Sequence, residues 1–161
     1  MSAQEIESEY RKVEAELLNR WPEKDLFNTL AELGVGCIAF SPLAQGLLTN
    51  KYLNGVPEKS RATAGSTFKK SFLSAENLNR VQALNEIARR RGQTLAQMAI
   101  AWVLRDKRVT SALVGARNIE QLDNSLDAVH KLEFTSAELE EIDRHAQDGA
   151  IDIWKGAREG S

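Results

Sequence analysis

The sequence contains very little cysteine and no long apolar run. Its single cysteine, Cys37, excludes an internal disulfide, so we expect a reducing compartment and a cytoplasmic protein. Cys37 lies inside a short apolar run, which favours a small core side chain over a nucleophile. No stretch reaches the roughly 18 apolar residues of a membrane span, and the polar, charged N-terminus does not resemble a signal peptide.

The sequence also lacks an excess of charge of either sign. The formal net charge is -2, which gives no electrostatic reason to expect nucleic acid or an anionic membrane as a partner. No internal repeat and no low-complexity tract is present. The length of 161 residues, with 42% hydrophobic and 27% charged residues, predicts one soluble globular domain over residues 1–161.

Most of the chain has helical patterning. Ser2–Arg20 carries apolar residues at helical spacing, Ile6, Tyr10, Val13 and Leu17, and Trp21-Pro22 ends the segment. This predicted helix either lies on its own domain or mediates self-association. Further helices are predicted at Lys24–Leu33, Ser74–Arg91, from Thr94 through the core residue Trp102, from Gly115 to about Val129, and from Thr135 to about Gln147.

A first strand candidate ends in an unusual loop. The apolar run Val35–Phe40 predicts a buried strand, and Ser41-Pro42 ends it because proline has no N–H group. Gly46 follows closely. We expect several free backbone N–H groups here, which suit an anion such as a pyrophosphate. The alternative is a plain strand-to-helix turn that binds nothing.

A second strand candidate, Val109–Val114, also leads into a glycine and a helix. Arg117 stands beside the N-terminus of that helix, where unpaired N–H groups carry partial positive charge, and its planar guanidinium suits phosphate. Gln121 lies one turn further on. The pattern predicts a nucleotide phosphate site, or alternatively a capped helix with a solvated arginine.

Three segments resemble the aldo-keto reductases. Phe40–Tyr52 resembles the seventh strand and its loop, Arg91–Trp102 the penultimate barrel helix, and Val109–Asn124 the eighth strand and last barrel helix. The resemblance is greatest to the branch of bacterial glyceraldehyde-3-phosphate reductases and potassium-channel beta subunits, and it covers roughly Glu16 to the end. It implies a (β/α)8 barrel that binds extended NADP(H) and reduces carbonyls.

The resemblance also implies which residues bind the cofactor. The first loop would follow the pyrophosphate, Lys51 and Arg61 would hold phosphate, and the second loop and helix would meet the 2′-phosphate and adenine. The residues so assigned are Phe40, Ser41, Pro42, Leu43, Gln45, Gly46, Lys51, Arg61, Gly115, Arg117, Gln121 and Asn124. The family's frequent acidic residue is absent at Asn124. We expect no metal site.

The family's catalytic Asp, Tyr, Lys and His lie in the first half of the barrel, and no residue here matches them. His130, His145, Tyr10 and Lys12 lack the required context. Residues 1–22 read as a helix outside the family pattern, joined to an aldo-keto-reductase-like segment over 23–161. The fold expected is α/β, a mostly helical fragment of a (β/α)8 TIM barrel with about two adjacent parallel strands covered by helices.

Three functions remain open at this point. The chain is the phosphate and adenosine half of an NADP(H) site without activity of its own, or a structural or self-association module that binds no nucleotide, or half of a reductase completed by another chain. Two short strands leave unpaired edges, so we also expect a homo-oligomer formed through the N-terminal helix or the strand edges.

Overall fold

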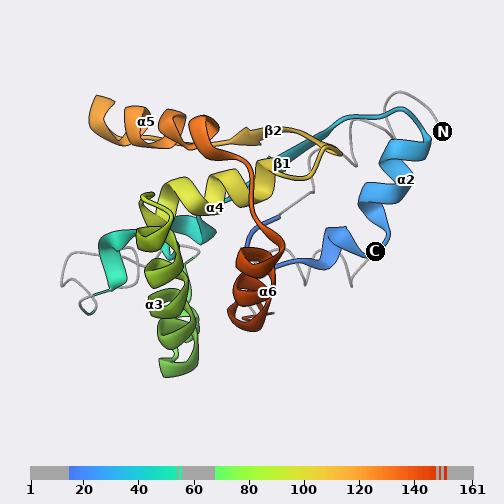
Figure 1. Ribbon diagram of the computed structural model, residues 1–161. Helices are drawn as coiled ribbons and strands as arrows, with labels where there is room; N and C mark the ends of the chain where they lie inside the picture. Colours follow the sequence, from blue (N-terminus) through green and yellow to red (C-terminus); the bar gives the residue numbers. More distant parts are fainter. Residues whose placement is uncertain (1–14, 54, 56–67, 148, 150, 152–161) are drawn as a thin grey trace.

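A computed structural model describes residues 15–53, 55, 68–147, 149 and 151 (Figure 1). Helices dominate and two short strands lie side by side, which confirms the predicted fold class. The strands are β1 (Cys37–Phe40) and β2 (Val109–Leu113). The helices are α2 (Leu26–Glu32), α3 (Ala75–Arg90), α4 (Leu95–Leu104), α5 (Ile119–Leu126) and α6 (Ser136–His145).

The strands pair in parallel, with Phe40 opposite Leu113. Helices α3 and α4 form the crossover between them, and α4 packs against β2. Eight of the ten residues of α4 are buried, because this helix is apolar on nearly every face. Trp102 is buried there, as predicted. No helix among the described residues is both long and apolar enough to cross a bilayer.

Side-chain caps fix where the helices begin. Ser74 accepts a hydrogen bond from the backbone of Asn77 at the start of α3, as expected for an N-cap. Two further helices begin with a capping box, formed by Thr94 with Gln97 in α4 and by Thr135 with Glu138 in α6. The predicted helix at Gly115 starts later, because Asn118 caps it and α5 covers only Ile119–Leu126 before a 3-10 segment.

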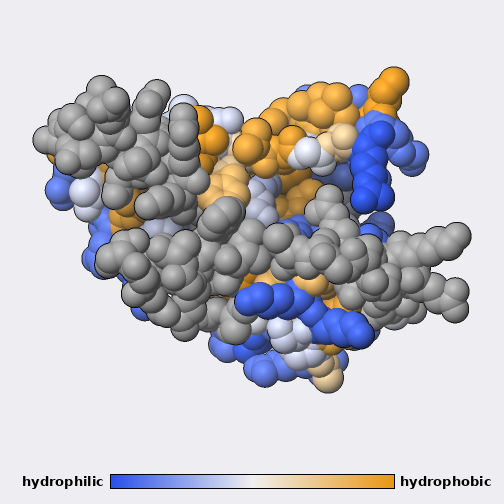
Figure 2. Space-filling model, turned by 180° about the vertical axis from the view of Figure 1, so that it is seen from behind, coloured by the Kyte–Doolittle hydropathy of each residue, from blue (hydrophilic) through white to orange (hydrophobic). Residues whose placement is uncertain are grey.

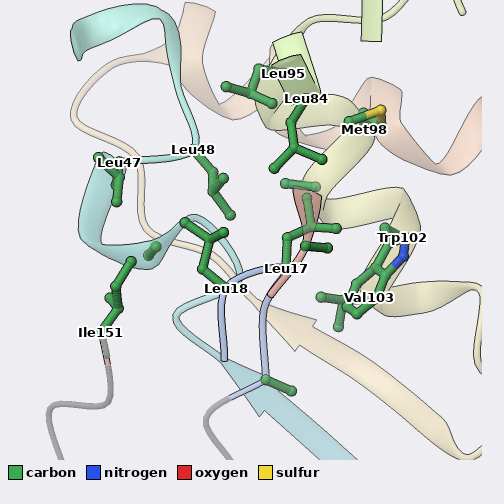
Figure 3. Packing of buried hydrophobic residues seen from close by; sticks show 14 of the residues in the cluster. Leu17, Leu18, Leu47, Leu48, Leu84, Leu95, Met98, Trp102, Val103 and Ile151 are labelled. Atoms are coloured by element: carbon green, nitrogen blue, oxygen red, sulfur yellow. The ribbon is translucent and has the colours of Figure 1, made fainter. Parts of the chain in front are cut away.

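The helix predicted over Ser2–Arg20 does not continue through residues 15–20. Glu16 and Asn19 exchange backbone hydrogen bonds of 3.0 and 3.2 Å in a tight turn. The turn puts Leu17 and Leu18 side by side in the core, so Leu17 does not lie on an exposed association stripe (Figure 3). The rest of the predicted helix, including Ile6, Tyr10 and Val13, lies outside the described residues.

One continuous core joins segments that are far apart in the sequence. Leu47 and Leu48, which follow the first loop, pack with Leu17 and Leu18 (Figure 3). The tail returns to the same core, since Ile151 is buried and Gly149 donates its N–H to the Leu18 carbonyl at 3.0 Å. Most of the predicted loop at 54–71 lies outside the described residues, but Phe68 is buried and stacks on Tyr52.

Candidate cofactor site

Both predicted binding loops leave the same end of the sheet. Because the strands are parallel and Phe40 pairs with Leu113, Ser41 and Val114 follow at the shared carboxyl edge. Ligands of parallel α/β sheets bind at that edge. The fold therefore brings the first loop and the segment that contains Gly115 and Arg117 to the same end of the sheet.

The first loop has a strained backbone. Ser41, Ala44 and Gln45 have positive φ angles of 60°, 46° and 56°, in the left-handed region that residues other than glycine seldom adopt. Each such residue costs about 1–3 kcal/mol, and strain of this kind is concentrated at functional sites. Gly46 follows with a φ of 97°, which explains the glycine. The loop holds its shape because two of its own side chains, those of Pro42 and Ala44, are buried in the protein.

The loop does not offer all the amides that the sequence suggested. The N–H of Ala44 donates to Ser41 at 2.8 Å, and those of Gly46 and Leu48 donate to Leu43 at 2.8 and 3.2 Å. The N–H of Leu47 also donates within the loop, to Ala44. The expectation of several free amides is wrong for these four groups, because the left-handed residues fold the loop back on its own carbonyls. An anion here would depend more on side-chain cations.

Lys51 lies one short turn beyond this loop. Thr49 begins that turn, because its hydroxyl donates to the Gly46 carbonyl at 2.7 Å and accepts from the Lys51 N–H at 3.3 Å. The Lys51 side chain is exposed, and its ammonium lies 5.4 Å from the centre of the Tyr52 ring. Arg61, predicted to act with Lys51, lies outside the described residues.

The start of α5 is organised by two polar side chains. Asn118 Oδ1 accepts from the Gln121 N–H at 2.9 Å, and Gln121 Oε1 accepts from the Arg117 N–H at 3.1 Å. The backbone of Arg117 is thus held in place while its side chain is exposed. Sequence reasoning missed Asn118, although an Asn three residues before Gln121 is a typical N-cap signal.

Asn124 connects two helices. Its Oδ1 accepts a hydrogen bond of 3.1 Å from the hydroxyl of Thr94, which caps α4. A polar hollow of about 890 Å³ lies beside this contact, with Thr94, Asn50, Gln82 and Asn85 among the residues that line it. Of the predicted cofactor residues, none of those that the structure describes lines the hollow. It is nevertheless adjacent to the site, because Asn50 precedes Lys51 and Thr94 bonds to Asn124.

The only cysteine of the sequence, Cys37, is buried in the core. Burial raises the pKa of the Cys37 thiol to about 11, and the nearby charge of Asp106 adds to the effect. A thiol with such a pKa is a poor nucleophile, which agrees with the predicted core role. No group of three or more potential metal ligands occurs among the described residues.

Known proteins resemble this chain over most of its length. The sequence model of the aldo/keto reductase family matches residues 2–147, which includes the N-terminal segment. L-glyceraldehyde 3-phosphate reductases of Escherichia coli O157:H7 and K12 are 51% and 50% identical over 148 residues. These matches cover 88% of this chain, which spans 42% of the relatives' length.

A solved structure also shares the fold. A thermostable aldo-keto reductase crystallised with the inhibitor epalrestat superposes with a TM-score of 0.57 at 24% identity. The superposition covers 83% of this chain and 38% of the other. The arrangement of two parallel strands and their helices is therefore a part of the larger reductase fold.

Proposed function

The chain belongs to the aldo/keto reductase family, and we propose that it carries the phosphate and adenosine half of an NADP(H) site. The observation that supports this most is the shared carboxyl edge, where the Ser41–Gly46 loop and the start of α5 both leave the sheet. Exposed cationic side chains, Lys51 and Arg117, follow these strands. This donor chemistry fits the phosphate groups of a dinucleotide.

Each part of the proposed site has a distinct task. The strained loop, with Phe40, Pro42 and Leu43, shapes the surface along the pyrophosphate, and Lys51 supplies charge. Arg117 faces the 2′-phosphate that distinguishes NADPH from NADH, since its guanidinium can form a paired set of hydrogen bonds with phosphate. Gly115 leaves room beside it, because a Cβ built there meets nothing within 4 Å.

Carbonyl reduction also requires catalytic groups, and we assign that role to no residue of this chain. We propose that the 161-residue chain alone does not oxidise NADPH in the presence of a carbonyl compound. In a completed barrel, by analogy with the E. coli relatives, the substrate would be a small phosphorylated aldehyde.

A calorimetric titration with NADPH and NADH tests the proposed site. Replacing Arg117 with alanine should weaken NADPH binding about 10- to 100-fold, the effect of losing a charged hydrogen bond of about 1.5–3 kcal/mol, and leave NADH unchanged. Lys107→Ala is the control, because Lys107 is an exposed cation before the opposite end of β2. An equal loss for both cofactors would refute the 2′-phosphate role.

A non-catalytic module without nucleotide is the second candidate. The four loop amides that already bond within the loop, and the engaged side chains of Gln121 and Asn124, favour it. Absence of saturable NADPH binding up to millimolar concentration would select this function, because the family motifs would then serve only as scaffold.

A further inference from the structure

One hydrogen bond joins the start of α4 to α5 at the adenosine end of the proposed site. The Thr94 hydroxyl donates to Asn124 Oδ1 at 3.1 Å. The same Thr94 oxygen accepts the N–H of Gln97 at 3.1 Å and thereby caps α4. Because a hydroxyl has a single proton, Thr94 gives this proton to Asn124 while one of its lone pairs holds the cap. Both side chains are half-buried.

The two sides of α5 differ in polarity. Ile119, Leu122 and Leu126 form an exposed apolar side, and Figure 2 shows apolar side chains gathered over this helix and the adjoining strands. Gln121 and Asn124 are three residues apart and lie on the other side of the helix. The bond from α4 therefore reaches α5 on its polar side.

The proton of the Thr94 hydroxyl determines which way the Asn124 amide points. An asparagine amide has an oxygen that accepts and a nitrogen that donates, and the two exchange places when the amide rotates by half a turn. With the oxygen toward Thr94, the hydroxyl proton has an acceptor, and with the amide reversed it would lose this acceptor. The bond uses one of the two lone pairs of Oδ1, so Oδ1 and Nδ2 can both still bond to a ligand.

The edge of a nucleobase requires one particular amide orientation. Adenine presents its 6-amino donor beside a ring-nitrogen acceptor, and an asparagine amide matches this pair with two hydrogen bonds. Hypoxanthine has an oxygen in place of the amino group, so an amide oriented for adenine places its own oxygen against that of the base. An amide held in one orientation therefore distinguishes the two bases better than an amide that is free to reverse.

We propose that Thr94 is a positioning residue, which sets the base preference of the dinucleotide site by holding the Asn124 amide in the orientation that fits adenine. This role rests on the proposed function, in which Asn124 meets the base. Capping α4 does not require the second bond, because the cap uses a lone pair of the hydroxyl and the bond to Asn124 uses its proton. Thr94 thus has a task beyond the start of its own helix.

Calorimetric titrations with NADPH and with its hypoxanthine analogue test this role. The two probes carry the same phosphates and the same nicotinamide, so the ratio of their dissociation constants isolates the base. The unchanged chain should prefer NADPH about 10-fold or more, which is the discrimination that one amide–base pair provides. Thr94→Val should reduce this preference below about 3-fold, and Thr94→Ser should retain it because serine keeps the hydroxyl.

Thr94→Asp should reverse the preference. A carboxylate still accepts the Gln97 N–H and caps α4, but it has no proton for Asn124 and accepts from Nδ2 instead. The amide should therefore turn round, and the chain should bind the hypoxanthine analogue more tightly than NADPH. The added negative charge weakens both probes alike and cancels in the ratio.

Thr135→Val is the matched control. Thr135 caps α6 with a capping box of the same kind, away from the loops at the strand ends. Both valine variants should lower the urea unfolding midpoint, because each loses a cap, but Thr135→Val should leave the ratio unchanged. In an Asn124→Ala background, Thr94→Val should have no effect on the ratio, since Thr94 acts through that amide.

Three outcomes would overturn the role of Thr94 and leave the proposed function intact. These are an unchanged ratio in Thr94→Val, a Thr94→Asp variant that still prefers NADPH about 10-fold, and an equal loss of the ratio in Thr135→Val. Absence of NADPH binding by the unchanged chain would instead refute the proposed function and this role together. The two failures are therefore distinguishable.

Discussion

Replacing Arg91 should destabilise the fold far more than replacing its neighbour Arg90. Arg91 is almost fully buried, and its Nη1 lies 2.8 Å from Glu138 Oε1. The guanidinium also donates to Gln93 Oε1 at 2.9 Å and to the Glu133 carbonyl at 3.0 Å, and it stacks 3.7 Å above the centre of the Phe134 ring. One side chain thus ties the end of α3 to the segment before α6.

The contact with Arg91 also changes the pKa of its carboxylate partner, Glu138. Burial raises the pKa of Glu138, but hydrogen bonds from the Thr135 backbone and the Arg91 guanidinium outweigh it, and the net pKa is lowered. Because the folded-state pKa is lowered, this stabilisation is present at neutral pH and is lost on acidification. Arg91→Met should retain the apolar stem and remove the charge and donors.

The expected loss follows from the burial of the pair. Removing one partner of a buried ion pair costs about 3–5 kcal/mol, and we take the lower end, about 3 kcal/mol, because Glu138 is partly exposed. With a urea slope of about 2 kcal/mol per molar, the unfolding midpoint should fall by about 1.5 M. Urea titration followed by circular dichroism measures this shift.

Arg90→Met provides the matched control. Arg90 also pairs with a glutamate of α6, Glu141, at 2.6 Å, but the two side chains are 57% and 35% exposed. An exposed pair contributes at most about 1 kcal/mol, so the midpoint should fall by no more than about 0.5 M. If the two variants lose equal stability, burial does not decide the strength of these pairs and the reasoning is refuted.

Two further predictions concern titratable groups. With a pKa of about 11, about one thousandth of the Cys37 side chains are thiolate at pH 8. Iodoacetamide should therefore label Cys37 more than about 100-fold slower in the folded chain than in urea. Rapid labelling of the folded chain would contradict the burial of this thiol. Hydrogen bonds from Arg108 lower the pKa of Asp106, so the stability that this pair adds above about pH 4 should be lost as the pH falls further. In Asp106→Asn, the urea unfolding midpoint should therefore decline less on acidification. An unchanged pH dependence of the midpoint would refute this contribution.

Local signals in the sequence were sufficient to predict most of the helices and both strands. Thr94 with Gln97, and Thr135 with Glu138, predicted where two helices begin, because a capping box satisfies backbone groups within four residues. The apolar runs that end at Phe40 and near Leu113 predicted both strands. Their adjacency followed from the family resemblance, since nothing local in either run specifies its partner.

Tertiary contacts decided the features that the sequence did not show. Leu17 continues the helical spacing of the apolar residues before it, yet residues 15–20 form a turn in which the buried Glu16 carboxylate accepts from the Leu18 N–H at 3.1 Å. That arrangement buries both Leu17 and Leu18 in the core. Likewise, Ser41-Pro42 and Gly46 indicated a loop, but not the left-handed residues that turn its amides inward.

The candidate site is supported by the chain's own core. Leu47 and Leu48 anchor the strained loop among Leu17 and Leu18, and the tail fastens the same leucine turn through Gly149 (Figure 3). Thr94, at the start of α4, contacts α5 through its hydrogen bond to Asn124. Contacts within the chain itself therefore hold the first loop and the start of α5 in place.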